Sequence, residues 1–358
     1  YTKDLIPKGV NWIKDFAVEI NPDSKEVSTK NSGNLTYDIL VVATGLVNDL
    51  DGIEGLREGL EKGVVCSNYV DPNKTWELLQ KFEGGNAVFT QPTTPIKCGG
   101  APQKAAYMAA DYFKKRGISN KTNIVYATPG SVIFGVKIIA DALMKVIGNY
   151  NIHLKTFYAP IKIDATQKIV YFKEVSTGEN KCVVNENNIL REKHTGNEIM
   201  EIPFDFLHLA PPQAPPAFIK NSALVNQAGW LDVNINTLQH NQHTTIFGLG
   251  DVAGLPTAKT GAAIRKQVPV VVDNILKVLK NQTADNQGYL GYSSCPLVVG
   301  YGKMILAEFN YKNEFTPDPK LKQMLVFTSN KPHWRLWFLK KYMLPHLYWN
   351  KMMKGENV

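Results

Sequence analysis

Two cysteines stand in sequence contexts that favour thiol chemistry. Cys98 lies within Ile96–Lys104, between two lysines and directly before a predicted helix that begins near Pro102. A helix N-terminus and nearby cations lower the pKa of a thiol and favour the reactive thiolate. Cys295 lies within Tyr292–Gly300, a polar stretch that also holds a proline. These contexts predict two redox-active thiols, although the sequence does not show that they meet in space.

Cys66 and Cys182 have no comparable context, and we expect both to be structural. Burial as a small hydrophobic residue is the common role of a free cysteine. Four widely separated cysteines do not form the disulfide framework of a small secreted domain. No closely spaced cysteine or histidine pair indicates zinc, so we predict no metal site.

Two glycine motifs stand at the ends of predicted strands. The first is Ala43-Thr44-Gly45, and the second is Phe247–Asp251. Small residues at such turns let backbone amides approach a cofactor closely. Each motif alone also fits a simple tight turn, whereas the two in this order indicate a dinucleotide-binding fold. The residues that we predict to bind the cofactor from these motifs are Thr44, Gly45, Gly250, Asp251, Lys259 and Thr260.

Asp251 and the helix that follows it have distinct expected roles. The Asp251 carboxylate can accept hydrogen bonds from a ribityl or ribose hydroxyl. The helix that starts near Lys259 and Thr260 would direct its positive end at an anionic ring or phosphate.

The chain alternates between predicted strands and helices. Continuous apolar runs of strand length are typical of strands that are covered on both faces. We expect strands at 38–43, 86–90, 122–126 and from 244 into the turn at 251. We expect helices at 71–82, 102–115, 137–146 and about 258–280, the last with a kink at Pro269. Short strands with polar turns are expected over 151–190, before a proline-rich break at 210–216.

This order predicts an α/β fold with two nested, Rossmann-like dinucleotide-binding domains. The outer domain would comprise residues 1–84 and 217–311, and the inserted domain residues 85–205. Residues 312–358 differ in character and form a separate C-terminal segment.

The inserted domain lacks the signals of nicotinamide binding. After its second predicted strand, the loop Ala127–Gly135 has only two glycines, too far apart for a GxGxxG motif. The stretch His153–Pro160 contains no acidic residue that could bind a ribose. We therefore predict that this domain does not bind NAD and that electrons come from elsewhere.

The C-terminal segment combines aromatic and basic residues. Trp and Tyr favour the membrane interface, and Lys and Arg attract anionic lipids. Lys340, Lys341 and Pro345 interrupt the segment, which predicts two short amphipathic helices lying in the interface. The alternative is a basic helix packed on the protein body. Nucleic acid is not expected as a partner, because no nucleic-acid-binding module is present.

Composition agrees with a globular protein that has anionic partners. The chain has 358 residues, of which 44% are hydrophobic and 20% charged, enough for a large core. The formal net charge of +8 favours a membrane surface or an anionic substrate. No apolar stretch reaches the roughly 18 to 20 residues that a membrane span requires.

Four stretches together resemble sulfide:quinone oxidoreductase, most closely its mitochondrial branch. They are KCGGAPQK, FGLGDVAGLPTAKT, YSSCPLVVGYGKMILAEF and PHLYWNKMM. The resemblance implies that the outer domain binds FAD and that the C-terminal segment docks on a membrane. It also implies oxidation of hydrogen sulfide, with two electrons passed to a membrane quinone.

The resemblance assigns Cys98 and Cys295 to the catalytic redox pair, bridged in the resting enzyme by a disulfide or trisulfide. Hydrosulfide would attack at Cys295 and leave a persulfide there. The persulfide sulfur would go to a small acceptor such as sulfite, glutathione or cyanide. Lys104 joins the residues expected at the cofactor. The aromatic residues expected at the quinone and the membrane are Tyr301, Phe338, Tyr348 and Trp349.

The resemblance implies a monotopic protein of the mitochondrial inner membrane or the bacterial plasma membrane. Two features depart from the family pattern. Residues 1–45 resemble the end of a domain, so we expect the N-terminal βαβ unit with its GxGxxG motif to be missing. Pro269 also falls within the helix after the flavin motif, where proline is not expected.

Three other functions fit parts of the sequence. A type II NADH:quinone oxidoreductase shares the fold, FAD and membrane helices, but the loop Ala127–Gly135 argues against it. A non-catalytic, membrane-attached flavoprotein relative is a second alternative. A soluble sulfide dehydrogenase that donates to a cytochrome is the third, and the basic aromatic tail disfavours it.

Overall fold

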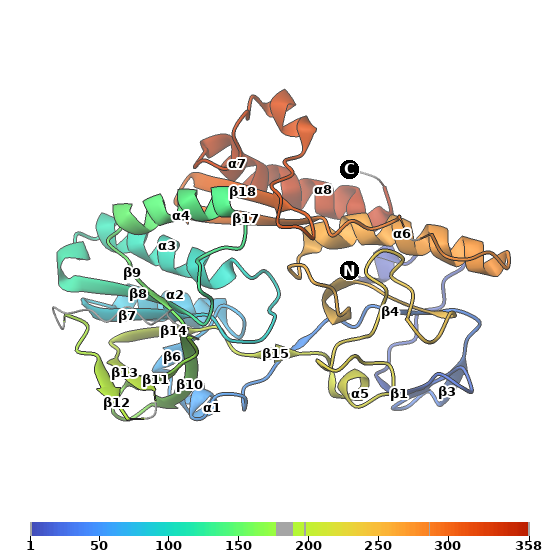
Figure 1. Ribbon diagram of the computed structural model, residues 1–358, viewed down its shortest axis with the longest axis horizontal. Helices are drawn as coiled ribbons and strands as arrows, with labels where there is room; N and C mark the ends of the chain where they lie inside the picture. The colour runs from blue at the N-terminus through green and yellow to red at the C-terminus, as the bar shows by residue number, and fades with distance from the viewer. Residues whose placement is uncertain (1, 177–188, 197, 286, 357–358) are drawn as a thin grey trace.

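The computed structural model describes residues 2–176, 189–196, 198–285 and 287–356. Figure 1 shows two α/β units side by side, with the C-terminal segment lying across the top of both. One unit holds a parallel sheet covered by helices, which confirms the predicted α/β class. Cys182, which we expected to be structural, lies outside the described residues.

The left-hand unit in Figure 1 is built on a five-stranded parallel sheet in the order β6-β14-β7-β8-β9. The strands are β6 (Val65–Cys66), β7 (Gly85–Thr90), β8 (Thr122–Thr128), β9 (His153–Thr156) and β14 (Phe206–Leu209). The strands β7, β8 and β14 are buried along most of their length. Such burial explains their continuous apolar sequences.

Three helices pack against this sheet, and all three were expected from the sequence. They are α2 (Pro72–Lys81), α3 (Ala101–Lys115) and α4 (Lys137–Asn149). The Asp71 side chain caps α2 by accepting hydrogen bonds from two of its first backbone N–H groups. Pro102 lies in the first turn of α3, where its missing N–H costs nothing.

A second, antiparallel sheet covers the first one. Its order is β10-β11-β13-β12, and its strands are β10 (Tyr158–Asp164), β11 (Ile169–Glu174), β12 (Lys193–Thr195) and β13 (Ile199–Pro203). Val88 and Val125 of the parallel sheet share one core with Phe172 and Ile202 of the antiparallel sheet. The helix α1 (Leu56–Glu61) closes this core through Leu56.

The domain boundary that we expected after residue 84 stays a prediction. β6 precedes that boundary but pairs with β14, Val65 opposite Leu207. We propose that the left-hand unit begins after β5 (Val47–Asn48) and ends with β14. A two-residue strand such as β6 has too little pattern to be recognised from the sequence.

The right-hand unit contains both glycine motifs. β4 (Leu40–Val42) and β16 (Ile246–Gly248) are parallel neighbours, so both motifs follow strands that end at the same edge. The long helix α6 (Gly261–Leu279) packs against them and continues through Pro269. It begins at Gly261 rather than near 258, because Thr260 caps it by accepting a hydrogen bond from the backbone N–H of Ala263.

A small antiparallel sheet and several short elements complete this unit. The sheet comprises β1 (Ala17–Asn21), β2 (Glu26–Thr29) and β3 (Asn34–Thr36). The short helices of this unit before α6 are η1 (Thr2–Leu5), α5 (Ala217–Lys220) and η3 (Gly250–Val252). The short helix η2 (Ser119–Lys121) belongs to the left-hand unit, between α3 and β8. The proline-rich break forms β15 (Gln213–Ala214), which pairs with β5 where the chain crosses between the two units (Figure 1).

A hairpin of β17 (Ser293–Gly300) and β18 (Lys303–Phe309) lies between the units and precedes the tail. β17 contacts both α3 and α6. The tail comprises η4 (Pro319–Met324), α7 (Trp334–Phe338), η5 (Leu339–Met343), α8 (Leu344–Asn350) and η6 (Met352–Lys354).

The tail forms one continuous helical run rather than the two separate helices that we expected. The α7, η5 and α8 segments follow one another without a break, and η5 is π-helical. The wider π-helical register accommodates Pro345, whose ring and missing N–H disrupt an α-helical one. Lys340 and Lys341 therefore lie within a helix instead of between two helices.

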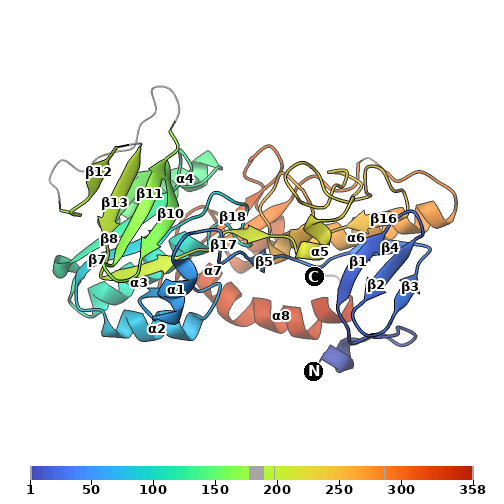
Figure 2. The same cartoon turned by 90° about the horizontal axis from the view of Figure 1, so that it is seen from below.

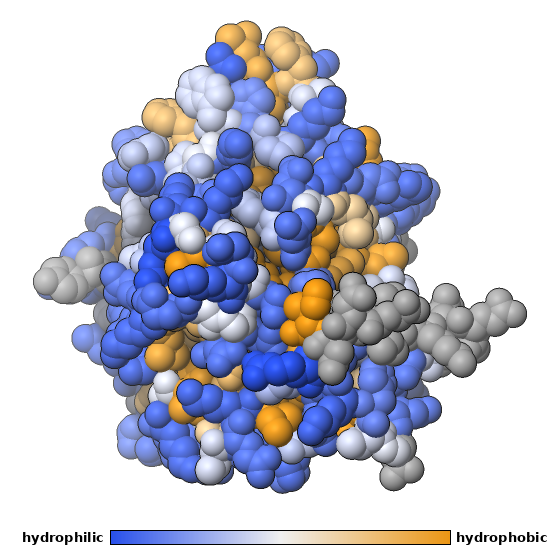
Figure 3. All heavy atoms as spheres, turned by 90° about the vertical axis from the view of Figure 1, so that its left-hand side faces the viewer, coloured by the Kyte–Doolittle hydropathy of each residue, from blue (hydrophilic) through white to orange (hydrophobic). Residues whose placement is uncertain are grey.

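The tail also carries exposed apolar side chains. Figure 2 shows α8 along the lower side of the molecule. In Figure 3, apolar atoms gather at the top of the molecule, where Figure 1 places the C-terminal segment. Within the part of the chain that the structure describes, no helix combines the length and apolar character needed to cross a bilayer.

Candidate redox-active dithiol site

The structure brings Cys98 and Cys295 together. Their Sγ atoms lie 3.9 Å apart, and both cysteines are free. Cys98 lies in the turn before α3, and Cys295 lies in β17, which packs on that helix. Gly100 permits this approach, because a Cβ at this position would lie 2.6 Å from Cys295 Sγ.

Lys104 lies against the pair and is itself half-buried. Its Nζ donates a hydrogen bond of 2.9 Å to Cys98 Sγ. A hydrogen bond with Cys295 holds the pKa of Cys98 well below its usual range. The charge of Lys104 lowers this pKa further, whereas burial acts in the opposite direction. The same bond, together with burial, raises the pKa of Cys295 well above its usual range. The site therefore favours a Cys98 thiolate beside a Cys295 thiol.

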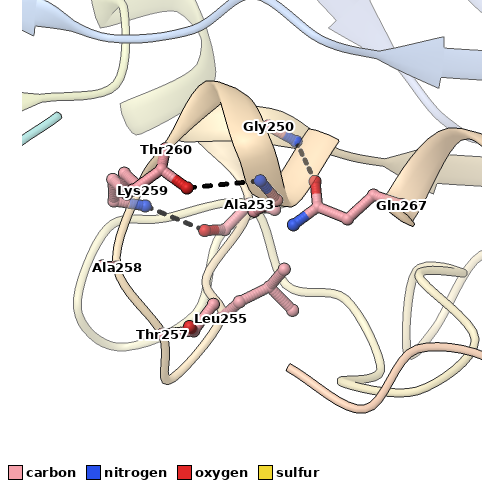
Figure 4. Close-up of a pocket in the computed structure, with 9 residues that line it drawn as sticks. Gly250, Ala253, Leu255, Thr257, Ala258, Lys259, Thr260 and Gln267 are labelled. Carbon is pink, nitrogen blue, oxygen red and sulfur yellow. Dashed lines mark hydrogen bonds between the residues drawn. The ribbon is translucent and has the colours of Figure 1, made fainter. Parts of the chain in front are cut away.

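The cofactor motif lies directly beside the cysteine loop. The backbone N–H of Cys98 donates a 2.7 Å hydrogen bond to the carbonyl of Lys259. The pocket in Figure 4 lies next to this contact and is lined by residues of the second glycine motif and the start of α6. Gln267 Oε1 accepts a hydrogen bond of 2.8 Å from the backbone N–H of Gly250 and fixes the turn.

The predicted cofactor residues suit a flavin dinucleotide. Gly45 and Gly250 adopt positive φ angles of 70° and 74°, and a Cβ at Gly45 would meet no atom within 4 Å. α6 presents its N-terminus at Thr260, next to this edge. Burial raises the pKa of the Asp251 carboxyl, which leaves a half-buried acid suited to a ligand hydroxyl. These features fit a flavin dinucleotide, and the assignment of these residues to cofactor binding stays a prediction.

The side chain of Lys259 has a more specific arrangement than the sequence indicated. Its Nζ donates to the carbonyls of Asp251 and Ala253, at 2.7 and 2.9 Å, and lies 3.7 Å from the ring centroid of Trp230. Burial lowers the pKa of Lys259 to about 8. The ammonium therefore ties the turn after β16 to the start of α6.

Lys340 is a residue that sequence analysis did not assign to the site. It lies in the π-helical segment of the tail, and its charge helps to lower the pKa of Cys98. Burial lowers the pKa of Lys340 itself, and the charge of Lys104 adds to this effect. The pair Lys340-Lys341 was visible in the sequence, but which lysine faces the dithiol depends on the helix register.

The aromatic residues expected at the quinone lie in two places. Phe338, Tyr348 and Trp349 belong to the tail and are 45%, 44% and 59% exposed. Tyr301 lies in the turn between β17 and β18, where its N–H donates to Asp111 of α3. Asp111 lies seven residues beyond Lys104, about 10 Å along the helix, so Tyr301 is separated from the dithiol.

Cys66 matches the structural role expected of it. It is 1% exposed, and its Sγ lies 3.4 Å from the carbonyl oxygen of Leu207. Burial raises the pKa of this thiol to about 12. Among the described residues, no group of three or more His, Cys, Asp or Glu side chains could hold a metal ion.

A cysteine pair with 3.9 Å between its sulfurs, set between two Rossmann-type units, defines a class of protein, the dinucleotide-binding oxidoreductases with a redox-active cysteine pair. Comparison with known proteins identifies the family. The chain is 37% identical over 356 residues to the mitochondrial sulfide:quinone oxidoreductase of Mus musculus. The aligned region covers 99% of this chain and 74% of that protein. It is 37% identical to the Dictyostelium discoideum protein of the same name. The chain belongs to the sulfide:quinone oxidoreductase family, as the sequence resemblance indicated.

Solved structures agree in fold. The sulfide:quinone oxidoreductase of Aquifex aeolicus superposes with a TM-score of 0.70 at 20% identity, over 96% of this chain and 76% of that one. A chain of the Tetrahymena thermophila mitochondrial ATP synthase reaches 0.77 at 21% identity, over 99% and 82% of the two chains. NDH2 of Plasmodium falciparum reaches 0.51 at 12% identity, over 92% and 84%. No protein-family model matches the chain.

Proposed function

We propose that this protein is an FAD-dependent enzyme that oxidises hydrogen sulfide and transfers two electrons to a membrane quinone. The observation that carries this proposal is the pairing of Cys98 with Cys295 at 3.9 Å, with Lys104 Nζ 2.9 Å from Cys98 Sγ. A close cysteine pair with one stabilised, partly exposed thiolate suits thiol–disulfide exchange. The relatives named sulfide:quinone oxidoreductase support the same substrates.

The first chemical step begins from the Cys98–Cys295 disulfide. Hydrosulfide attacks Cys295 Sγ, the bond between the two sulfurs breaks, and its electron pair stays on Cys98. The products are a Cys295 persulfide and a Cys98 thiolate. Lys104 stabilises this leaving group, because a thiol of low pKa leaves fastest in such exchanges.

The second step releases sulfur from Cys295. A small acceptor, which we propose to be sulfite, glutathione or cyanide, attacks the outer persulfide sulfur and leaves Cys295 as a thiolate. A flavin held by the two glycine motifs would accept the two electrons that return the cysteine pair to its disulfide and would pass them to quinone. Thr44, Gly45, Gly250, Asp251 and Thr260 would hold it, and we propose Lys104, which donates a hydrogen bond to Cys98 Sγ, as a further residue at the cofactor.

The tail is our proposed contact with the membrane and its quinone. Trp334, Phe338, Tyr342 and Trp349 are exposed on one helical run that also carries lysines. Aromatic and cationic side chains together suit the interface of an anionic bilayer. We propose monotopic attachment to the mitochondrial inner membrane, in line with the mitochondrial relatives.

Spectroscopy of the flavin-loaded protein tests the chemistry. We expect sulfide to bleach the flavin in the absence of oxygen, through a transient long-wavelength band. Cys98→Ser and Cys295→Ser should each abolish bleaching, whereas the buried Cys66→Ser should retain it. Undiminished turnover in either variant of the pair would refute the thiol mechanism.

A further inference from the structure

The proline-rich break at 210–216 has no part in the chemistry described so far, yet it carries a buried glutamine side chain, that of Gln213. Gln213 is 2% exposed and lies in β15, where the chain crosses between the two units (Figure 1). β15 pairs antiparallel with β5, and Gln213 stands opposite Asn48. Flanking prolines restrict the backbone and hold this short strand extended.

The Gln213 side chain connects this crossing to the cysteine loop. Its Oε1 accepts a hydrogen bond of 2.8 Å from the backbone N–H of Lys97, the residue before Cys98. Its Nε2 donates a hydrogen bond of 2.8 Å to Asn48 Oδ1. The backbone N–H of Gln213 donates to Thr94 Oγ1 at 2.9 Å. The loop is thus joined to both strands of the crossing.

Tyr69 contacts the next two peptide groups of the same loop. Its hydroxyl lies 3.3 Å from the carbonyl oxygen of Lys97 and 3.4 Å from that of Cys98, and donates to them. Asn48 Nδ2 donates to the carbonyl of Tyr69 at 2.8 Å. Gln213, Asn48 and Tyr69 therefore form one connected network around the backbone of Lys97 and Cys98.

The backbone that this network holds is unusual. Cys98 has a φ of 54°, in the left-handed region that residues other than glycine seldom adopt. Such a conformation persists only where the surrounding structure enforces it. The direction of the Cys98 side chain, and so the position of its sulfur, depends on this φ angle.

We propose that Gln213, with Asn48 and Tyr69, is a positioning residue that holds Cys98 in its left-handed conformation and so places the sulfur beside Lys104 and Cys295. The meaning of this role for turnover rests on the proposed function. The role itself concerns the sulfur position and can be measured without turnover.

The test uses Gln213→Met, which keeps the size of the side chain and removes both hydrogen bonds. The second variant is Tyr69→Phe, which removes only the hydroxyl. The readout is the pH profile of Cys98 alkylation in the reduced, full chain, with the labelled site identified by mass spectrometry. We expect both variants to move the midpoint upward by about one pH unit, which is about tenfold less thiolate below the midpoint.

Asn86→Leu is the matched control. Asn86 is also buried, 1% exposed, and its Nδ2 donates to the carbonyls of Leu190 and Pro203, but it lies at the start of β7 and away from Cys98. We expect this variant to lower thermal stability and to leave the Cys98 profile unchanged. Profiles of Gln213→Met and Tyr69→Phe that coincide with the unsubstituted chain would overturn the proposal, whatever their stability.

Failure of the proposed function would look different. A flavin-loaded protein that ignores sulfide would contradict sulfide oxidation. The alkylation profiles would still decide the role of Gln213, because they require neither sulfide nor quinone.

Discussion

Cys98 and Cys66 show how the surroundings of a thiol decide its chemistry. Cys98 Sγ accepts a hydrogen bond of 2.9 Å from Lys104 and lies 3.9 Å from Cys295 Sγ. Cys66 Sγ is surrounded by the core of the parallel sheet and has no cation beside it in the contacts that the structure describes. The pKa of the first thiol is lowered, and that of the second is raised to about 12. Only Cys98 is therefore suited to act as a thiolate near neutral pH.

Lys104→Met tests the electrostatic part of this arrangement. The depressed pKa of Cys98 means that its thiolate is fully formed above that pKa and is lost as the pH falls through it. Removal of the cation should move the midpoint of Cys98 alkylation to higher pH, by about one unit. Lys114→Met, in the exposed last turn of α3, should leave the midpoint in place. Equal midpoints for both variants would contradict a role for Lys104.

The neighbouring glycines Gly99 and Gly100 provide a second test at this scale. A Cβ at Gly100 would lie 2.5 Å from a Leu297 methyl and 2.6 Å from Cys295 Sγ, whereas a Cβ at Gly99 would meet no atom within 4 Å. We expect Gly100→Ala to lower the free energy of unfolding by about 1–3 kcal/mol, as overpacking does. Gly99→Ala should change it by less than about 0.5 kcal/mol. Chemical denaturation of the two variants compares them directly, and equal losses would argue against the close packing at Gly100.

At the scale of elements, the tail that we propose as the membrane contact also carries a charge that acts on the dithiol. The continuous run from α7 to α8 contains the π-helical segment η5, which carries Lys340, whose charge helps to lower the pKa of Cys98. Its neighbour Lys341 lies over the rings of Trp337 and Tyr342 instead. A π-helical turn shifts the side chains that follow it relative to an α-helix. The helix register therefore decides which of the two lysines acts on the pKa of Cys98.

Lys340→Met and Lys341→Met form a matched pair for this element. Loss of Lys340 should raise the midpoint of Cys98 alkylation, because one of the cations that lower the pKa of Cys98 is gone. Loss of Lys341 should leave the midpoint unchanged and weaken binding to anionic vesicles, measured by flotation. A shift with Lys341→Met alone would show that the register of η5 differs in solution.

At the scale of the whole molecule, the two units divide their tasks. The right-hand unit supplies the glycine motifs, and the left-hand unit supplies the cysteine loop and α3. The left-hand unit retains a parallel sheet of the kind that binds dinucleotides. Its loop after β8 lacks the glycine spacing for a pyrophosphate, and the carbonyl of Gly130 in that loop accepts a hydrogen bond from Phe157.

NADH provides the test at this scale. We expect NADH to leave the flavin spectrum of the loaded protein unchanged at concentrations where sulfide bleaches it within seconds. The physical reason is the loop after β8, which offers no close approach for a pyrophosphate. Prompt bleaching by NADH, with no response to sulfide, would favour a type II NADH:quinone oxidoreductase and leave Cys98 and Cys295 without a catalytic role.

Sequence patterns were sufficient for the local elements. The α2, α3 and α4 helices and the strands β7 and β8 follow from apolar periodicity and from capping residues such as Asp71, which act within a few residues of the chain. β6 was not recognised from the sequence, because it has only two residues and is defined by its pairing with β14. Strand pairing between distant segments leaves little trace in either segment alone.

The sequence by itself determined that Cys98 is a candidate thiolate, since Lys104 and the helix start that favour one are its neighbours along the chain. Only the tertiary structure decided that Cys295 is its partner, that the charge of Lys340 lowers the pKa of Cys98, and that Gln213 is hydrogen-bonded to the loop. The physical reason is the distance along the chain over which each interaction acts. Helix capping and local charge act over a few residues, whereas a contact between distant segments exists only after the core has brought β17, the tail and the crossing strands together.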